Sequence, residues 1–163
     1  MILIYSEKVL GVDIPQVVPL CDALDAKIIP LVGEDLDCLH RAVKKAVAGV
    51  ALRTGKRLWV ALARELRPDL TIYLWGPAPI RGKNIVPIRP ASAYAGPGFY
   101  YVRDRDELRG LRGKEVLGLL LDARGFDPYT LELVIKGRAT CGCDGCGLVE
   151  RLLCEPYREV EVL

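Results

Sequence analysis

The residues best suited to chemistry are four cysteines near the carboxyl end: Cys141, Cys143, Cys146 and Cys154. Their spacing is C-x-C-x2-C-x7-C, with glycines among the first three. Because glycine allows positive φ, a tight loop could turn several sulfurs toward one point. Converging thiolates are the ligands of a tetrahedral zinc ion or an iron–sulfur cluster. The spacing, however, matches neither the paired CxxC motifs of common zinc sites nor the ferredoxin patterns.

Disulfides and free thiols are the two other interpretations of the cysteines. The chain has six cysteines, since Cys21 and Cys38 lie toward the amino end. An even count fits a disulfide framework, although the sequence selects no pairing. Cys143-Asp-Gly-Cys146 is the nearest approach to a redox CxxC motif, without a thioredoxin-like setting around it. Three hypotheses therefore stay open: metal or cluster ligands, disulfides, and free or redox thiols.

A basic segment in the middle of the chain is the second candidate site. Residues 76–98 contain five prolines and four glycines and no acidic residue, and this predicts mostly loop, with a short strand at 84–88. Arginine and lysine interleaved with tyrosine suit contacts with phosphates and bases. An exposed, solvated loop is an equal alternative. The predicted RNA- or phosphate-binding residues are Arg81, Lys83, Arg89, Arg103 and Arg105.

Two aspartates near residue 122 form a third candidate. Asp122 ends the apolar run 115–122, and Asp127 follows in the next loop. In open α/β sheets ligands gather at the carboxyl ends of strands, so this pair could bind a metal or a hydroxyl group. The sequences Asp-Ala-Arg-Gly and Asp-Pro favour a simpler role in turns.

Hydrophobic patterning predicts the elements that position these residues. Apolar residues at helical spacing predict a long helix over 35–53, and shorter helices are predicted over 19–25, 104–111 and 147–154. The segment 57–66 fits either a strand or a helix. Apolar runs predict strands at 2–5, 27–32, 70–75, 99–102, 115–122, 130–135 and 157–163.

Alternation of strands and helices, with several wholly apolar strands, predicts one α/β domain over 1–163. Its sheet is expected to be largely parallel and flanked by helices, SPOUT-like or Rossmann-like. No run of eighteen apolar residues occurs and no secretory signal opens the chain, so we expect a cytoplasmic protein that does not contact membranes.

Composition narrows the function further. The chain has a single Gln, Asn, Met and His, and a depletion of thermolabile side chains favours a thermophilic source. Intracellular proteins of hyperthermophilic archaea can carry disulfides. Taken alone, the net charge of +2 is too small to indicate that the chain binds nucleic acids. His40 is the only histidine, and it is expected in the core. Catalytic triads that depend on histidine and metal sites with several histidines are therefore excluded.

The order of elements between Asp35 and Arg103 resembles that of SPOUT-class RNA methyltransferases, in particular the archaeal tRNA pseudouridine N1-methyltransferases. The segments that carry it are LDCLHRAVKKAV, RLWVALAREL, RPDLTIYLWG and GPGFYYVR, with EVLGLLLD, TLELVIKG and REVEVL later in the chain. The resemblance implies an S-adenosylmethionine pocket, an RNA substrate and a strand over 57–63. It gives Arg103 and the loop near Gly137 a role toward RNA or cofactor.

These observations support three functional hypotheses. The first is an RNA-associated protein of SPOUT-like ancestry, either an S-adenosylmethionine-dependent methyltransferase or an inactive relative. The second is a small module that binds zinc or an iron–sulfur cluster. The third is a disulfide-stapled interaction protein without catalysis. We also expect the chain to self-associate as a homo-oligomer, a dimer.

Overall fold

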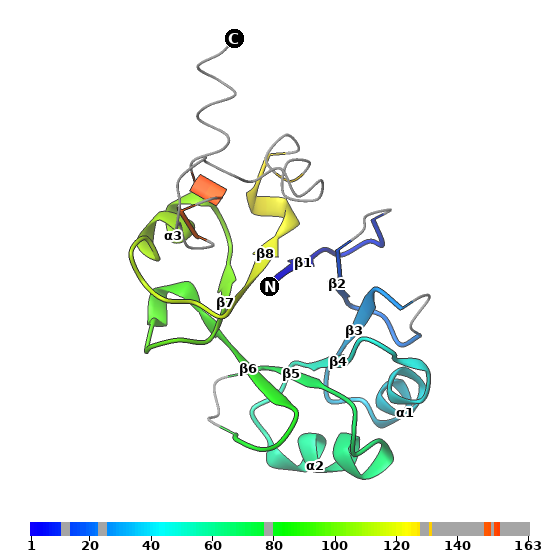
Figure 1. Cartoon of the computed structure of the whole chain (residues 1–163). Helices are drawn as coiled ribbons and strands as arrows, with labels where there is room; N and C mark the ends of the chain where they lie inside the picture. The colour runs from blue at the N-terminus through cyan, green and yellow to red at the C-terminus, as the bar shows by residue number, and fades with distance from the viewer. Residues whose placement is uncertain are drawn as a thin grey trace.

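Eight parallel strands close into a barrel in the computed structural model (Figure 1). The structure describes residues 1–10, 14–22, 26–76, 80–127, 131, 149–150 and 152–153. The strands are β1 (Ile2–Tyr5), β2 (Gln16–Val18), β3 (Ile28–Val32), β4 (Val50–Leu52), β5 (Ile72–Trp75), β6 (Ile85–Pro90), β7 (Phe99–Val102) and β8 (Gly118–Asp122).

Each strand pairs with the next strand of the chain, and the barrel closes where β8 pairs with β1. The closing register runs from Ile2 opposite Leu119 to Tyr5 opposite Asp122. Open doubly wound sheets instead reverse their strand order at a switch point. The prediction of an α/β domain with a parallel sheet is therefore confirmed. Its closure into a barrel was not predicted, and a SPOUT-like or Rossmann-like arrangement is not confirmed.

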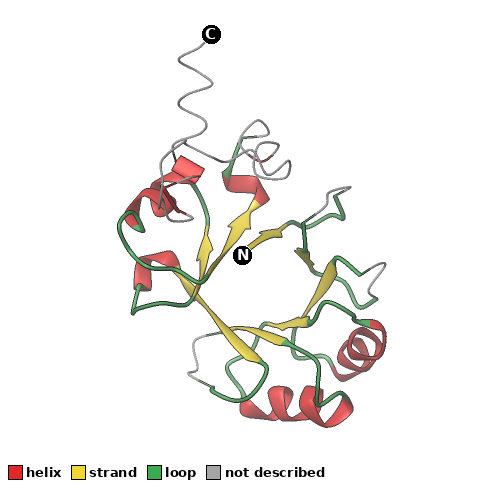
Figure 2. Ribbon diagram, in the orientation of Figure 1, coloured by secondary structure: helices red, strands yellow, loops and turns green. Residues whose placement is uncertain are grey.

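Three α-helices lie outside the ring of strands (Figure 2). They are α1 (Leu36–Lys45), α2 (Arg57–Leu66) and α3 (Arg105–Gly110), with short 3₁₀ helices η1 (Ala91–Ala93) and η2 (Ala123–Gly125). Helix α1 begins with an N-cap, because the Asp35 side chain accepts a hydrogen bond from the Cys38 amide. Asp104 caps α3 in the same way through the Glu107 amide. Loops make the other described connections between strands.

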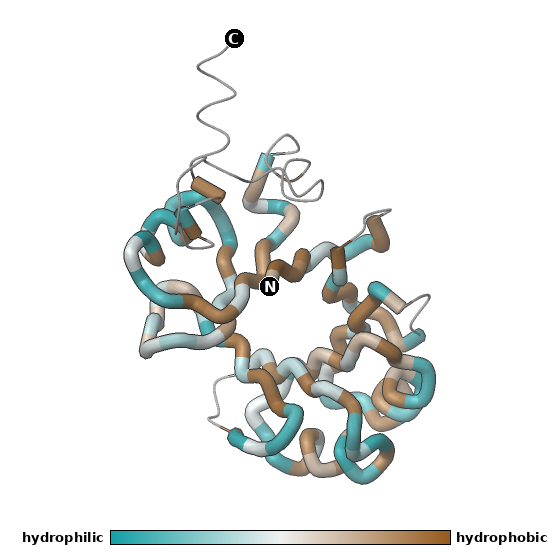
Figure 3. Tube along the Cα trace, in the orientation of Figure 1, coloured by the Kyte–Doolittle hydropathy of each residue, from teal (hydrophilic) through white to brown (hydrophobic). Residues whose placement is uncertain are grey.

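The interior of the barrel is filled by side chains that alternate along each strand. Layers built from alternate strands are the usual packing of such barrels. Figure 3 shows hydrophobic residues along the ring and hydrophilic stretches on the outer helices. By register, one layer is Leu3, Ile29, Tyr73 and Phe99, the next is Val17, Ala51, Ile88 and Leu120, and the layer nearest the carboxyl ends is Tyr5, Leu31, Trp75 and Tyr101.

Two predicted helices are wrong at least in part. The helix predicted over 35–53 ends at Lys45, and its last residues form β4. Gly49 has a φ of 131°, which no helix allows, and Val50 then enters the sheet between β3 and β5. The helix predicted over 19–25 is absent from its described residues 19–22, which follow β2. Barrel pairing outweighs helical spacing in both segments.

The ambiguous segment 57–66 is the helix α2, so the strand implied over 57–63 is wrong. His40 is exposed on α1, and its expected place in the core is also wrong. The short strand predicted at 84–88, within the segment predicted to be mostly loop, is confirmed as β6. The strands predicted at the amino end and around β3, β5, β7 and β8 are confirmed, as is the short helix α3.

The last predicted elements fall largely outside the described residues. The strands at 130–135 and 157–163 lie there, apart from Leu131, while residues 149–150 and 152–153 are helical as predicted. Within the described part of the chain, no helix is long and apolar enough to cross a membrane.

Cys21 and Cys38 form a disulfide, with a Cα–Cα distance of 4.8 Å. It ties the segment after β2 to the first turn of α1. Asp22, the next residue, pairs with Arg41 at 3.0 Å and with Lys45 at 3.6 Å on the same helix. The connection between β2 and β3 is thus fixed to α1 at two successive residues.

Replacement of both cysteines by alanine should lower the free energy of unfolding by about 3 kcal/mol, because the bond closes a loop of this length in the unfolded chain. Guanidinium unfolding of the oxidised double variant and wild type measures the difference. Mass spectrometry of a non-reducing digest is the control, since it identifies the cross-linked peptide. Recovery of alkylated Cys21 and Cys38 from oxidised protein would contradict the pairing.

Candidate functional site at the carboxyl ends of the strands

A cavity of about 550 Å³ opens at the carboxyl ends of four consecutive strands, β3 to β6. Because all strands are parallel, their carboxyl ends share one rim, the end at which barrels of this type carry their functional residues. We call this region the mouth. A volume of this size is typical of small-molecule sites. The cavity is lined by Glu34, Arg53, Thr54, Gly55, Trp75, Gly76, Ile88 and Pro90.

Three aromatic side chains form the floor of the mouth. Tyr5, Trp75 and Tyr101 occupy the last inward positions of β1, β5 and β7. The Trp75 ring lies 5.2 Å from the Tyr5 ring and 4.6 Å from the Tyr101 ring, between ring centroids. Tyr5 is buried, whereas Trp75 and Tyr101 are partly exposed. Trp75 therefore presents aromatic surface to the cavity, and Tyr5 and Tyr101 pack beside it in the barrel interior.

Arg53 follows β4 and lies over this floor. Its guanidinium carbon is 4.6 Å from the centroid of the Trp75 ring. The side chain is exposed, and among the described residues no carboxylate pairs with it. Gly76 permits the close approach of the two strand ends, because a Cβ there would lie 2.1 Å from the carbonyl oxygen of Thr54. Arg53 is thus a positive charge available to a ligand.

Glu34 follows β3 and is held by two donors. The Thr54 hydroxyl donates to Oε1 at 3.0 Å, and the Lys56 ammonium donates to Oε2 at 3.2 Å. The bond from Thr54, followed by the bond and charge of Lys56, lowers the pKa of Glu34 below its usual value. Glu34 is therefore ionised at neutral pH and can accept further hydrogen bonds.

Asp122 ends β8 and is only 3% exposed. Arg124 binds both of its oxygens, through Nε at 3.0 Å and Nη2 at 2.8 Å, and the Tyr101 hydroxyl also donates to it. Burial acts to raise the pKa of Asp122, but the hydrogen bonds from Arg124 and Tyr101 outweigh it, and the pKa is lowered. Glu7 contacts the same guanidinium at 2.9 Å.

Burial, followed by the bond to Asp122, raises the pKa of Tyr101 to about 12. Arg124, shared by Asp122 and Glu7, has a raised pKa as well. The three acidic groups with shifted pKa values at the mouth, Glu34, Asp122 and Tyr101, all move away from neutrality. Glu34 and Asp122 are thus charged and Tyr101 is neutral at neutral pH, which suits the mouth to binding by charge and stacking.

The predicted RNA-binding residues do not gather at one place. Arg81 and Lys83 lie in the connection that enters β6 at its amino end, and Arg89 is half-buried within β6. The other two follow β7 at the carboxyl side: Arg103 pairs with Glu107, and Arg105 of α3 donates to the carbonyl of Leu153.

The cysteine cluster Cys141, Cys143, Cys146 and Cys154 lies outside the described residues, as does Gly137. Its possible states, and the predicted cofactor role of the loop near Gly137, stay predictions. Among the residues that the structure does describe, no group of three or more His, Cys, Asp or Glu side chains could hold a metal ion.

Sequence reasoning missed most of the mouth. Glu34 and Arg53 were assigned to the ends of one long helix, whereas they follow neighbouring strands. Trp75 was placed correctly at the end of a strand, and Asp122 was raised as a ligand-binding candidate. These four residues share one sequence feature: each is a polar or aromatic residue at or just after the end of a short apolar run. The feature indicates a common site only once the strands are known to close into a barrel, because closure places their carboxyl ends on one rim.

Comparison with family models found no match, and neither the curated proteins nor the solved structures gave one. The resemblance to SPOUT-class methyltransferases therefore stays a prediction, and the site is interpreted from its own geometry.

Asp122 should make the protein acid-sensitive in a defined pH range. Because its folded-state pKa lies below the ordinary value of 3.8, its ionised form stabilises the fold above that pH. This contribution should disappear as the pH falls from about 4 toward the lowered pKa. Denaturant unfolding of wild type and Asp122→Asn between pH 6 and pH 2 measures it.

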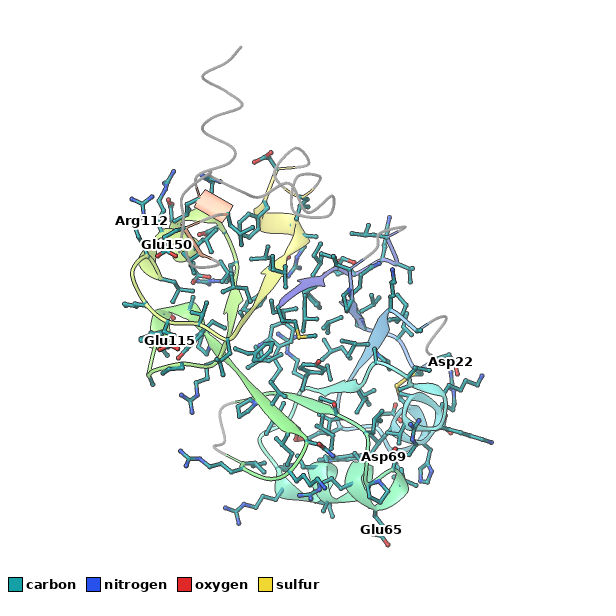
Figure 4. All side chains as sticks on the ribbon, in the orientation of Figure 1. Asp22, Glu65, Asp69, Arg112, Glu115 and Glu150 are labelled. Carbon is teal, nitrogen blue, oxygen red and sulfur yellow. A yellow bond between two sulfur atoms is a disulfide. The ribbon has the colours of Figure 1, made fainter. Side chains whose placement is uncertain are left out.

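The variant should lose less stability than wild type over the acidic part of this range. Asp69→Asn is the matched control, because Asp69 is exposed and lies in the turn after α2 (Figure 4). An Asp122→Asn variant as acid-sensitive as wild type would contradict the ionised carboxylate.

Proposed function

We propose that this chain binds a ribonucleotide at the mouth of its barrel, either as a free molecule or as part of an RNA strand. The observation that carries the proposal is a combination within one cavity of about 550 Å³: an aromatic face, an arginine without a carboxylate partner among the described residues, and an ionised carboxylate. These match the base, the phosphate and the ribose hydroxyls of a nucleotide.

The base is assigned to Trp75. Arg53 is exposed over this ring, and a cation–π contact at an exposed site stabilises by only about 0.5–1 kcal/mol. Stacking of a base on an aromatic side chain contributes about 1–3 kcal/mol. A base can therefore replace the guanidinium on the ring, since the exchange is favourable and Arg53 can swing toward solvent.

The phosphate is assigned to the displaced Arg53 and to the start of α2. Helix amino ends favour anions, yet the first turn of α2 contains no acidic residue and Lys56 at its N-cap makes no side-chain cap bond. A phosphate in the cavity beside Gly55 would supply the negative charge that this helix end lacks.

The ribose is assigned to Glu34. Its pKa is lowered, so the carboxylate accepts hydrogen bonds at neutral pH, and a carboxylate is a suitable acceptor for a ribose hydroxyl. Lys56 balances its charge, which limits repulsion between Glu34 and the phosphate.

The methyltransferase hypothesis predicts a different preference at the same site. S-adenosylmethionine has a base and a ribose but no phosphate; its only anionic group is the carboxylate of its methionine part, and its net charge is positive. The charge of Arg53 supports a nucleotide over this cofactor, because a guanidinium attracts an anion and repels the positively charged sulfonium. A titration with both ligands separates the two hypotheses.

Isothermal titration with adenosine 5′-monophosphate, adenosine and S-adenosylmethionine tests the proposal. The monophosphate should bind more tightly than the other two. Trp75→Leu should weaken it by about five- to 150-fold, the range expected for one stacked base. Arg53→Ala should weaken it by at least about tenfold, because a charge-assisted hydrogen bond is lost.

Arg112→Ala is the matched control for Arg53→Ala. Arg112 is exposed beside α3, on the other side of the ring from α2 (Figure 4). This control should bind like wild type. No measurable binding of any nucleotide by wild type, or equal weakening in both arginine variants, would overturn the proposal.

Glu34 should set the preference for ribose. Wild type should bind adenosine 5′-monophosphate at least about tenfold more tightly than its 2′-deoxy form, since a hydrogen bond to a charged group is missing in the latter. In Glu34→Ala the two ligands should bind alike. Glu65→Ala, at the far end of α2, is the control (Figure 4). A ribose preference that survives in Glu34→Ala would disprove this role.

A further inference from the structure

A second recess, of about 390 Å³, lies on the outside of the barrel between α2 and the segment that enters β6. Its floor is apolar and its charged residues are all arginines. We call it the arginine groove. It is lined by Arg57, Val60, Ala61, Arg64, Ile80, Arg81 and Ile85.

The three arginines of the groove are Arg57, Arg64 and Arg81. Four exposed arginines elsewhere in the described residues pair with carboxylates: Arg41 with Asp22, Arg103 with Glu107, Arg109 with Asp106, and Arg124 with Asp122 and Glu7. Within the same described part of the chain, no carboxylate pairs with the three arginines of the groove. Three like charges thus gather around one recess without compensation.

The helix fixes this arrangement. Arg57, Ala61 and Arg64 have the spacing i, i+4, i+7 and therefore share one face of α2. The two arginines are about 10 Å apart along the helix axis. The Arg64 guanidinium lies against Gly82, where a Cβ would be 2.8 Å from Nη1. Arg81 comes from the opposite wall, so the charges line both sides of the groove.

The arrangement does little for stability. Arg57 is in the first turn of α2, where the helix dipole disfavours a cation. Arg64 is in the last turn and is favourable there, but Arg81 gains nothing from the helix. The adjacent Glu65 points away from the barrel and makes no ion pair with Arg64 among the described residues (Figure 4).

We propose that the arginine groove binds the phosphate backbone of single-stranded RNA. Several positive charges spread along a recess suit a ligand with successive phosphates better than a small monovalent anion. The recess is concave, and its volume admits the backbone of one strand. Its amino-terminal arginine, Arg57, follows directly after the mouth residues 53–56, so a strand can run from the mouth along α2. The choice of RNA rests on the proposed function; the groove itself is a separate site.

Fluorescence anisotropy with a 5′-fluorescein-labelled oligouridylate of twelve nucleotides, over a series of KCl concentrations, tests the groove. Wild type should bind with an affinity that falls as salt rises. The variant Arg57→Ala/Arg64→Ala/Arg81→Ala should bind at least about tenfold more weakly at low salt. Its slope of log affinity against log salt should be smaller by about 2, since each phosphate contact with a single strand contributes about 0.7.

Two further variants test whether the loss of RNA binding depends on charge and on the position of the arginines in the groove. Replacement of the same three arginines by lysine keeps the charge and should keep most of the salt slope. Arg112→Ala removes an arginine outside the groove and should bind RNA like wild type. Thermal unfolding confirms that the variants fold, which is expected because two of the three side chains are exposed and Arg64 is only partly buried.

The two proposals fail in different ways. Trp75→Leu should lose adenosine monophosphate while keeping the salt slope for RNA, and the triple alanine variant should do the reverse. A triple variant with unchanged RNA affinity and slope would overturn the groove. So would wild type that binds vesicles of anionic phospholipid but not the oligonucleotide. Neither result would affect the titration of the mouth.

Discussion

The pairing of β8 with β1 is the constraint on which the rest of the structure depends. Four residue pairs, from Ile2–Leu119 to Tyr5–Asp122, close the barrel and leave no sheet edge among its strands. Closure brings the two ends of the described barrel together and turns eight strand ends into one rim. It also aligns Tyr5 with Asp122, so that Glu7, two residues after β1, and Asp122, the last residue of β8, both contact Arg124. The mouth exists because of this closure.

The same side chains serve packing and binding at the mouth. Tyr5, Trp75 and Tyr101 complete the last interior layer, and their rings touch one another. Large rings suit this position, because small aliphatic side chains would leave the barrel open to water at its end. Once present, they offer a ligand a rigid aromatic surface at little cost in conformational entropy. Asp122 is fixed by Tyr101 and Arg124, and these hydrogen bonds tie the floor to the end of β8.

Much of the local structure could be predicted from the sequence, but the site could not. Apolar runs located β3, β5, β7 and β8, and their burial on both faces correctly indicated a parallel sheet. Closure depends on the register between residues more than one hundred positions apart, and no local pattern reports that. The apolar spacing from Leu36 to Val50 looked continuous because β4 is only three residues long. Gly49 interrupts it, and with that break Arg53 moves from a helix end to the rim of the barrel.

The hydrogen-bond and ion-pair partners of the arginines distinguish those that hold the structure together from those that are free to bind a ligand. Several arginines hold elements together: Arg41 pairs with Asp22 and Arg124 with Glu7, while Arg67 donates to the carbonyls of Val43 and Ala46. Arg53 and the three arginines of the groove lack such partners within the described residues, and they lie on consecutive parts of one surface, from the end of β4 along α2. Unpaired like charges repel one another and are not retained for stability. Their shared position, together with the uncompensated amino end of α2, is most simply explained by an anionic ligand that passes from the mouth onto the helix face.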